Sequence, residues 1–351
     1  MADAVLNGPP EARRSDVFVR IRHALSFRNV SALYIFVALF IIFSIWVPET
    51  FLTSSVWHSL LDQGALTAIV SMALVLPLSA GAFNLAIGAE VGFGAILVAW
   101  LLSRHGVPVP AAMILTVFVG CAVGAVSGLL VTRAAIDSFI ATLGVSSILL
   151  AATAWLSGSQ QILDLGAGFQ SVAASQLFGF TYPVWMMLVI AGVVAYILDR
   201  TPVGRRVYAT GGNAASARLA GVRTSRTLVL CLLGCGGLAA FAGSLASARL
   251  ATGDPTIGPG YLLPAYAAAF LGSTQFRSGR YNVWGTVVAV YVLATGVKGL
   301  QLAGAPVWIP DLFNGLALLL AVGLARVQRV SGRMRAVRGT LRRTSTADAT
   351  Q

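Results

Sequence analysis

Residues 199–226, DRTPVGRRVYATGGNAASARLAGVRTSR, form the only long polar interval between the two ends of this sequence. Apolar residues of the kind found in membrane helices fill the chain on both sides of it. Thr201 and Pro202 predict a helix start, with threonine as the N-cap and proline at the first helical position. Gly211 and Gly212 then predict a break in the backbone. The interval is therefore expected to lie outside the membrane as two short helices.

The second of these helices has clear end signals. Asn213 is expected to cap it, residues 214–220 to form it, and Gly221 to end it in the left-handed conformation. A helix of two turns is marginal alone in water, so it needs a surface to pack on. Two interpretations stay open from this spacing. The helix docks into another protein at the membrane surface, or the interval is an ordinary cytoplasmic loop made basic by membrane topology.

Composition places the chain among polytopic membrane proteins. Of its 351 residues, 57% are hydrophobic and 10% are charged, and the mean hydropathy is +0.82. These values exclude an ordinary soluble domain. A net charge of +12 would suggest nucleic acid in a soluble protein. Here membrane topology explains that charge, and no nucleic-acid partner is expected.

The sequence does not support an enzyme. Lys298 is the only lysine and follows Val297, so the chain has no Gly-Lys-Ser/Thr phosphate loop and is not itself a P-loop ATPase. Cys121, Cys231 and Cys235 lie within apolar runs. A metal or redox pair is conceivable for the last two, but small buried side chains are the favoured interpretation. No catalytic residue, cofactor or metal site is predicted.

About ten membrane segments are predicted, with both termini in the cytoplasm. The first segment follows a polar arm of residues 1–29 and is expected to stay uncleaved. Residues 326–351 are basic and then rich in serine and threonine, as in a disordered tail. The transmembrane domain is expected over residues 30–325. Its predicted spans are 30–47, 56–77, 83–103, 109–131, 138–157, 183–198, 227–250, 259–275, 282–302 and 309–325.

The distribution of positive charge supports this orientation. Of the 24 lysine and arginine residues, 21 fall on the side that holds the termini. Arg104, Arg249 and Lys298 fall on the other side. Basic residues concentrate on the cytoplasmic side of membrane proteins. The sequence thus predicts a multi-pass protein in contact with membrane lipid, with its basic side in the cytoplasm.

Stripes of small residues predict close helix packing. Gly120, Gly124 and Gly128 repeat every four residues, and Ala239 and Gly243 begin a similar series that ends at Ser247. Helices in lipid approach one another along such stripes. We expect these contacts within one chain rather than between two chains.

The second informative stretch is PLSAGAFNLAIGAEVGFGAIL, residues 77–97. Its proline and glycines predict a broken helix, and transporters place such breaks along the substrate path. Glu90 is the one carboxylate well inside a predicted span, with either a functional role or a hydrogen-bonded structural role. The candidate translocation residues are Phe83, Asn84, Gly88 and Glu90.

Four motifs, taken together, resemble one family. Residues 81–88, GAFNLAIG, look like its GGIDLSVG, and residues 137–144, DSFIATLG, look like its PPFIVTLG. Residues 201–213, TPVGRRVYATGGN, are similar to its TxxGRxxYAxGGN, and residues 267–273, AAAFLGS, to its AAVVLGG. The chain resembles the permease subunit of bacterial ATP-binding-cassette importers for sugars of the ribose, xylose and galactose type. Asn84 stands where that family usually has aspartate, which weakens any transfer of the family's substrate preference to this chain but not of its architecture.

The resemblance implies a mechanism and a set of partners. Two permease chains, identical or different, would form the path for a sugar or related polyol. A periplasmic or lipid-anchored binding protein would deliver that substrate, and separate ATPase subunits would dock on the short helix within residues 211–221. The expected coupling residues are Gly211, Gly212, Asn213, Arg218, Leu219 and Gly221.

Two further expectations complete the sequence analysis. The alternative function is a secondary transporter that is driven by an ion gradient and works without an ATPase. It is disfavoured because the predicted spans hold few ionisable residues. In addition, residues 56–157 and 227–325 are possible inverted repeats of four helices each, because span 56–77 would run inward and span 227–250 outward.

Overall fold

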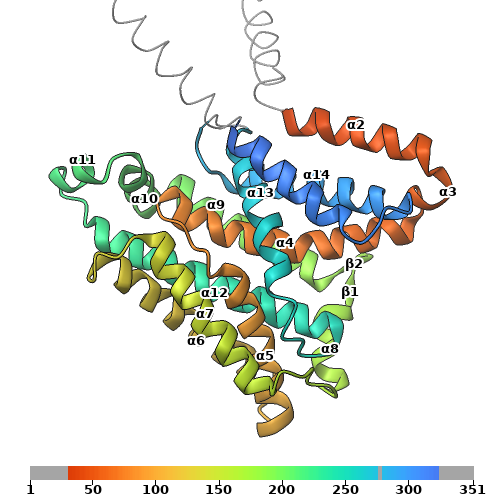
Figure 1. The fold of residues 1–351 in the computed structure, drawn as a ribbon, viewed down its shortest axis with the longest axis horizontal. Coiled ribbons are helices and arrows are strands. Elements are labelled where there is room, and N and C mark those ends of the chain that lie inside the picture. The colour runs from red at the N-terminus through yellow and green to blue at the C-terminus, as the bar shows by residue number, and fades with distance from the viewer. Residues whose placement is uncertain (1–30, 276–278, 324–351) are drawn as a thin grey trace, which may run out of the picture.

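The computed structural model describes residues 31–275 and 279–323, and these fold into one helical body (Figure 1). The predicted arm 1–29 and tail 326–351 lie outside the described residues. Where the description begins, α2 and α3 lead into the long helix α4. The helices up to the polar interval are α2 (Ser31–Trp46), α3 (Pro48–Phe51), α4 (Ser54–Ser79), α5 (Ile87–His105), α6 (Val109–Thr132), α7 (Ser138–Ser157), α8 (Ala167–Ala174) and α9 (Tyr182–Arg200).

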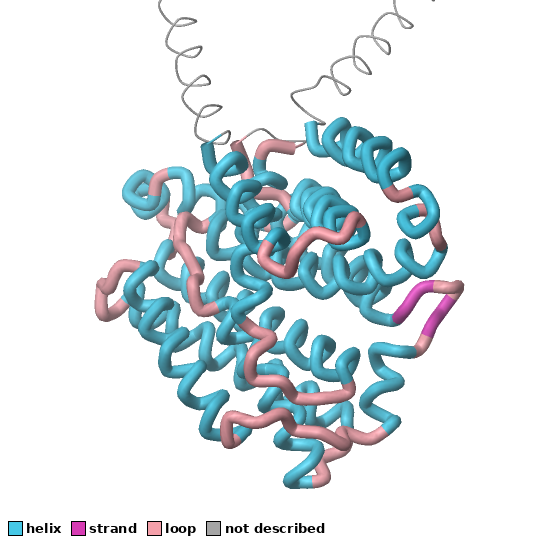
Figure 2. The backbone as a smooth tube through the Cα atoms, turned by 45° about the vertical axis from the view of Figure 1, so that its right-hand side comes forward, coloured by secondary structure: helices cyan, strands magenta, loops and turns pink. Residues whose placement is uncertain are grey.

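The polar interval and the second half of the chain continue the helical pattern. Their elements are α10 (Pro202–Gly212), α11 (Ala214–Leu219), α12 (Thr224–Leu250), the 3-10 turn η1 (Pro259–Tyr261), α13 (Leu262–Ser273) and α14 (Val283–Leu302). A further apolar helix covers Ile309–Gly323. The fold class is thus all-α, apart from one small hairpin. Its strands, β1 (Gln176–Leu177) and β2 (Phe180–Thr181), pair antiparallel at the edge of the body (Figure 2).

Seven described helices are long and apolar enough to cross a membrane. They are α4, α5, α6, α7, α9, α12 and α14. The apolar runs Tyr34–Trp46 and Ile309–Gly323 are shorter, and α13 has 12 residues. At 1.5 Å per residue, α13 is shorter than the hydrocarbon core of a bilayer. The polytopic architecture is confirmed, whereas the count of ten spans stays a prediction.

Helix α12 lies at the centre of the fold and packs on α4, α5 and α6. Its small residues permit this because the neighbouring backbones come very close. A Cβ atom added at Gly124 of α6 would lie 2.8 Å from the carbonyl carbon of Leu232 in α12. One added at Gly94 of α5 would lie 2.7 Å from the Cα of Ala240. The prediction that these stripes pack within one chain is confirmed.

Aromatic side chains secure the first helices against the body. The ring of Phe51 is fully buried and lies edge-on to Trp57, with 5.4 Å between the ring centroids. Phe43 of α2 covers Gly299 of α14, where an added Cβ would overlap the phenyl ring. Apolar contacts of this size hold α2 and α3 in place although both are short.

The structure confirms a break within residues 77–97 and places it between α4 and α5. Pro77 lies inside the last turn of α4, and α5 is continuous from Ile87 to His105. The break is the turn between them, residues 80–86. Gly88 and Gly92 stay helical because they pack against Gly258, whose backbone lies 3.0 and 3.3 Å from the Cβ that each would carry. Here glycine serves close packing rather than a helix break.

Candidate functional site

The polar interval forms a compact projection from the helical body, made of α10 and α11 (Figure 1). Thr201 is the N-cap residue of α10 and Pro202 follows it, as predicted. The Thr201 hydroxyl does not cap this helix, because it donates to the Ile197 carbonyl of α9 at 2.6 Å. The expected break between two short helices is present directly after Gly211 and Gly212, which form the last residues of α10, and Asn213 separates that helix from α11.

Both ends of α11 match the predicted caps. The Asn213 side chain accepts a hydrogen bond from the Ser216 amide at 3.1 Å. Gly221 has a φ of 81°, a conformation that glycine adopts without strain. The amide of Val222 then bonds back to the Ala217 carbonyl at 3.0 Å, which closes the turn.

The outer face of α11 is open to solvent. Leu219 is 92% exposed, the highest value of any large apolar side chain within α10 or α11. Arg218 beside it is also exposed, whereas Ala217 is buried against the body. A leucine beside an arginine on a capped helix gives an apolar contact and a cation at a fixed position. This is an arrangement suited to binding another protein.

The inner face of α10 sits directly on the end of α4. A Cβ at Gly211 would overlap the carbonyl oxygen of Ser79 and lie 2.9 Å from its carbon. Gly81, at the start of the turn 80–86, approaches Gly211 from the same side. The hydroxyl of Tyr208 donates to the Tyr281 carbonyl at 2.8 Å. Two contacts thus anchor the projection to the body. One is with the C-terminal end of α4, and the other is with the segment before α14.

The turn 80–86 ends in a buried polar cluster. The Asn84 side-chain amide donates to Glu90 Oε2 at 3.0 Å and lies 3.2 Å from Cys235 Sγ. The Asn84 backbone amide donates to the hydroxyl of Tyr266 at 3.1 Å. Asn84 is fully buried and Glu90 is 2% exposed. Within the described residues, Glu90 Oε1 has no hydrogen-bond partner.

The four candidate translocation residues do not share one environment. Asn84 and Glu90 meet in this cluster. Gly88 is packed against Gly258. Phe83 is 37% exposed, and its ring lies edge-on to Phe139 of α7 at 5.6 Å between centroids.

The turn 80–86 therefore connects the projection to the helix core. Gly81 contacts the last turn of α10, and Asn84 is bonded to α5 and α13 and lies against α12. Sequence reasoning singled out both ends of this connection but not their contact. Of the residues that complete it, Ser79 and Tyr266 gave no signal of their own, and Cys235 was expected to be a small buried side chain. Only their distances in the fold associate them with the site.

The three cysteines form no disulfide bond with one another. Cys231 and Cys235 are buried and Cys121 is half-buried, and all three are free thiols. No group of three His, Cys, Asp or Glu side chains that could hold a metal ion occurs in the described part of the chain.

Replacing Asn84 with alanine should destabilise the folded protein. The change leaves the buried Glu90 carboxylate without its hydrogen-bond donor, which costs about 2 kcal/mol or more. We expect a lower unfolding temperature for the full chain in detergent. Glu90→Gln is the matched variant, because glutamine keeps an acceptor oxygen for Asn84, and its unfolding temperature should change much less. Equal shifts for the two variants would contradict this role.

Comparison with known proteins identifies the chain. Residues 57–322 match the family described as "Branched-chain amino acid transport system / permease component". The chain belongs to this family. It is a multi-pass inner-membrane permease subunit of an ATP-binding-cassette importer, as the motifs predicted. The family membership supports this function over the secondary transporter.

Several relatives of the permease are named importer components. It is 32% identical over 270 residues to the ribose import permease protein of Bacillus subtilis (strain 168), which covers 76% of this chain and 84% of the relative. It is 28% identical over 304 residues to the D-allose transport system permease protein of Escherichia coli (strain K12), which covers 87% and 93%. It is 28% identical over 292 residues to the autoinducer 2 import system permease protein of Salmonella paratyphi B (strain ATCC BAA-1250 / SPB7), which covers 83% and 84%. No solved structure gives a significant match.

Proposed function

We propose that this permease moves a sugar or a related polyol across the inner membrane, and that ATP hydrolysis by separate subunits drives the movement. Relatives that are named for ribose and D-allose support the substrate class. The observation that carries the coupling proposal is the exposed, capped helix α11 on the anchored helix α10. The coupling residues are Gly211, Gly212, Asn213, Arg218, Leu219 and Gly221.

The partners follow from this function. ATPase subunits dock on α11, with Leu219 as the apolar contact and Arg218 as the charged one. A periplasmic or lipid-anchored binding protein delivers the substrate, and a second permease chain, identical or different, completes the path. The permease spans the membrane ten times with both termini in the cytoplasm. Residues 56–157 and 227–325 form an inverted repeat in this proposal.

The contacts suggest how force reaches the substrate path. Movement of a docked ATPase displaces α10, and the tight contact between Gly211 and Ser79 passes that displacement to the end of α4. The turn 80–86 then moves against the cluster of Asn84 and Glu90. The path runs beside this turn, with Phe83, Asn84, Gly88 and Glu90 along it. ATP binding would thereby select between outward-open and inward-open states.

Two variants of α11 test the coupling proposal. Gly221→Pro is incompatible with a φ of 81°, because proline holds φ near −65°. Arg218→Glu reverses the charge at the docking surface. We expect both to lose ATP-dependent sugar uptake and recovery of the ATPase in pull-downs from solubilised membranes, while membrane insertion is kept.

The control for the charge reversal is Arg133→Glu, an exposed arginine at the end of α6. Its uptake should equal that of the parent chain. Unchanged uptake in both α11 variants would refute the docking site. Solute transport into liposomes by the permease alone, without ATP, would instead favour the secondary transporter.

A further inference from the structure

A cavity of about 780 Å³ lies where the projection meets the helical body. Its walls come from four helices, with Leu76 from α4, Leu198 from α9, Arg206 from α10 and Arg226 from α12. The short connection from α11 to α12 closes one end. A volume of this size is typical of a small-molecule ligand site. None of the residues assigned to coupling or translocation above, except Gly221, lines it.

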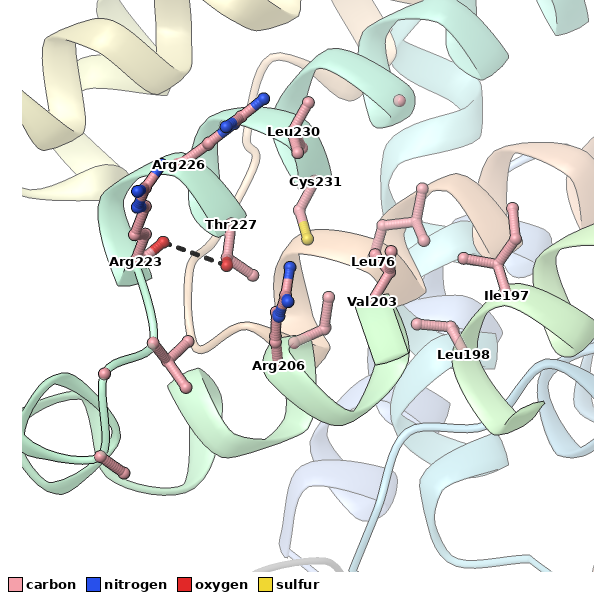
Figure 3. Close-up of a pocket in the computed structure, with 15 residues that line it drawn as sticks. Leu76, Ile197, Leu198, Val203, Arg206, Arg223, Arg226, Thr227, Leu230 and Cys231 are labelled. Atoms are coloured by element: carbon pink, nitrogen blue, oxygen red, sulfur yellow. Dashed lines mark hydrogen bonds between the residues drawn. The ribbon is translucent and has the colours of Figure 1, made fainter. Parts of the chain in front are cut away.

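Charge is distributed unevenly around this cavity. Arg206, Arg223 and Arg226 lie on one side of it, and Leu76, Ile197 and Leu198 lie on the other (Figure 3). No aspartate or glutamate is among the lining residues that the structure describes. Two of the arginines stand at the start of the 27-residue helix α12, where the helix dipole adds positive potential. The cavity therefore pairs an anion-binding end with an apolar end.

The apolar end continues onto the outer surface of the membrane helices. Ile197 and Leu230, which line the cavity, are 37% and 49% exposed. On α9, Val193 and Val189 extend the same face at four-residue intervals and are 53% and 65% exposed. This face belongs to a helix long and apolar enough to span the membrane. A hydrocarbon chain can thus leave the cavity along α9 without entering water.

We propose that this cavity binds one anionic glycerophospholipid. Its phosphate is held by Arg206, Arg223 and Arg226, whose planar guanidinium groups bind phosphate oxygens in pairs. One acyl chain passes between Leu198 and Leu230 and then follows α9. Basic pockets between membrane helices recognise lipid headgroups in this way. A protein side chain or a free anion would use the arginines but not the apolar exit.

A lipid bound in this cavity would link two parts of the fold. Arg206 belongs to α10, whereas Arg223 is the N-cap residue of α12 and Arg226 lies in its first turn. A shared phosphate therefore ties the projection to the central helix of the fold. Its negative charge also reduces the repulsion among the three arginines that line the cavity. This lipid site is separate from the proposed substrate path, and its test does not depend on transport.

Native mass spectrometry of the full chain in detergent provides that test. Phosphatidylglycerol is titrated into the parent chain and into a variant with Arg206→Gln, Arg223→Gln and Arg226→Gln together. We expect at least about tenfold weaker binding of phosphatidylglycerol to the variant, since each basic side chain near a headgroup contributes about one factor of five. Phosphatidylcholine should bind the parent chain more weakly, and millimolar inorganic phosphate should not displace phosphatidylglycerol.

A matched control carries Arg104→Gln, Arg133→Gln and Arg205→Gln, three exposed arginines outside the cavity. It has the same net charge as the test variant and should bind the lipid like the parent chain. Val203→Trp keeps every charge and fills the cavity mouth, where Val203 is 45% exposed. We expect it to weaken lipid binding as well.

Four results would overturn the proposal. Equal losses in the test and control variants would mean that net charge alone attracts the lipid. Normal binding by Val203→Trp would mean that the cavity is not used. Displacement by inorganic phosphate would indicate a free-anion site. Unchanged lipid binding together with lost ATPase recovery in the arginine variant would make this surface part of the protein interface.

Discussion

Gly124→Leu should abolish folding of the permease. The α6 backbone at Gly124 lies directly against α12, where a Cβ would overlap the Leu232 carbonyl oxygen and lie 3.0 Å from the Cα of Leu233. Neither contact is with the end of a flexible side chain, so the helices must separate to admit leucine. Overpacking of a core costs about 1–3 kcal/mol even where side chains can adjust. Here the cost should exceed that range, because α12 is packed on three other helices.

The measurement is the yield of monodisperse protein after detergent extraction, followed by gel filtration. We expect at least about a tenfold loss of folded protein for Gly124→Leu, because separating α6 from α12 removes core packing along both helices. Gly144→Leu is the matched control, since Gly144 lies in the apolar helix α7 and nothing is within 4 Å of its Cβ position. Similar yields for the two variants would mean that the α6–α12 contact does not determine folding.

Gly211→Val should leave folding normal and abolish transport, in contrast to Gly124→Leu. A valine side chain cannot fit between α10 and the carbonyl of Ser79, so the end of α10 must lift away from α4. Helix α10 keeps its anchor near the other end, where Gly204 packs closely on the Leu198 backbone. The membrane helices are untouched. We therefore expect ATP-dependent uptake to fall at least about tenfold, an effect of about 1.4 kcal/mol or more on the coupled step.

This prediction is checked by uptake in whole cells, with membrane content and ATPase recovery measured in parallel. Gly192→Val is the control for added volume in a helix, because no atom lies within 4 Å of the Cβ position at Gly192. Retained ATPase recovery with lost uptake would place the defect between docking and translocation. Normal uptake by Gly211→Val would remove the contact between α10 and α4 from the proposed mechanism.

Local signals in the sequence were sufficient for most helices and for the caps of the projection. Apolar runs predict membrane helices because an unpaired backbone polar group is costly in lipid. The caps at Asn213 and Gly221 depend on atoms only a few residues apart, and the structure confirms both. The stripe from Gly120 to Gly128 also predicts close packing, because only small side chains allow it. The four motifs led to the correct family.

Glycine shows where local reasoning stops. The predicted breaks lie in the turn 80–86 and at Asn213, whereas Gly88, Gly92, Gly211 and Gly212 beside them are helical. The reason at three of them is a neighbour far along the chain. Gly258 lies against Gly88 and Gly92, and Ser79 lies against Gly211. Glycine permits both a turn and a close approach, so the residue alone cannot distinguish them.

Which polar and charged side chains become neighbours depends still more on the tertiary structure. Asn84 and Glu90 are near in sequence, but Cys235 and Tyr266 join them only because α12 and α13 fold back onto the turn 80–86. In the sequence, Arg206 and Arg226 are two unrelated basic residues. In the structure, they line the same cavity because α10 and α12 both border it. Whether a segment forms a membrane helix depends on its own apolar residues and on hydrogen bonds between residues four apart, so the local sequence is sufficient to predict it. Contacts between helices depend on which backbones can come close, and that is a property of the packed whole.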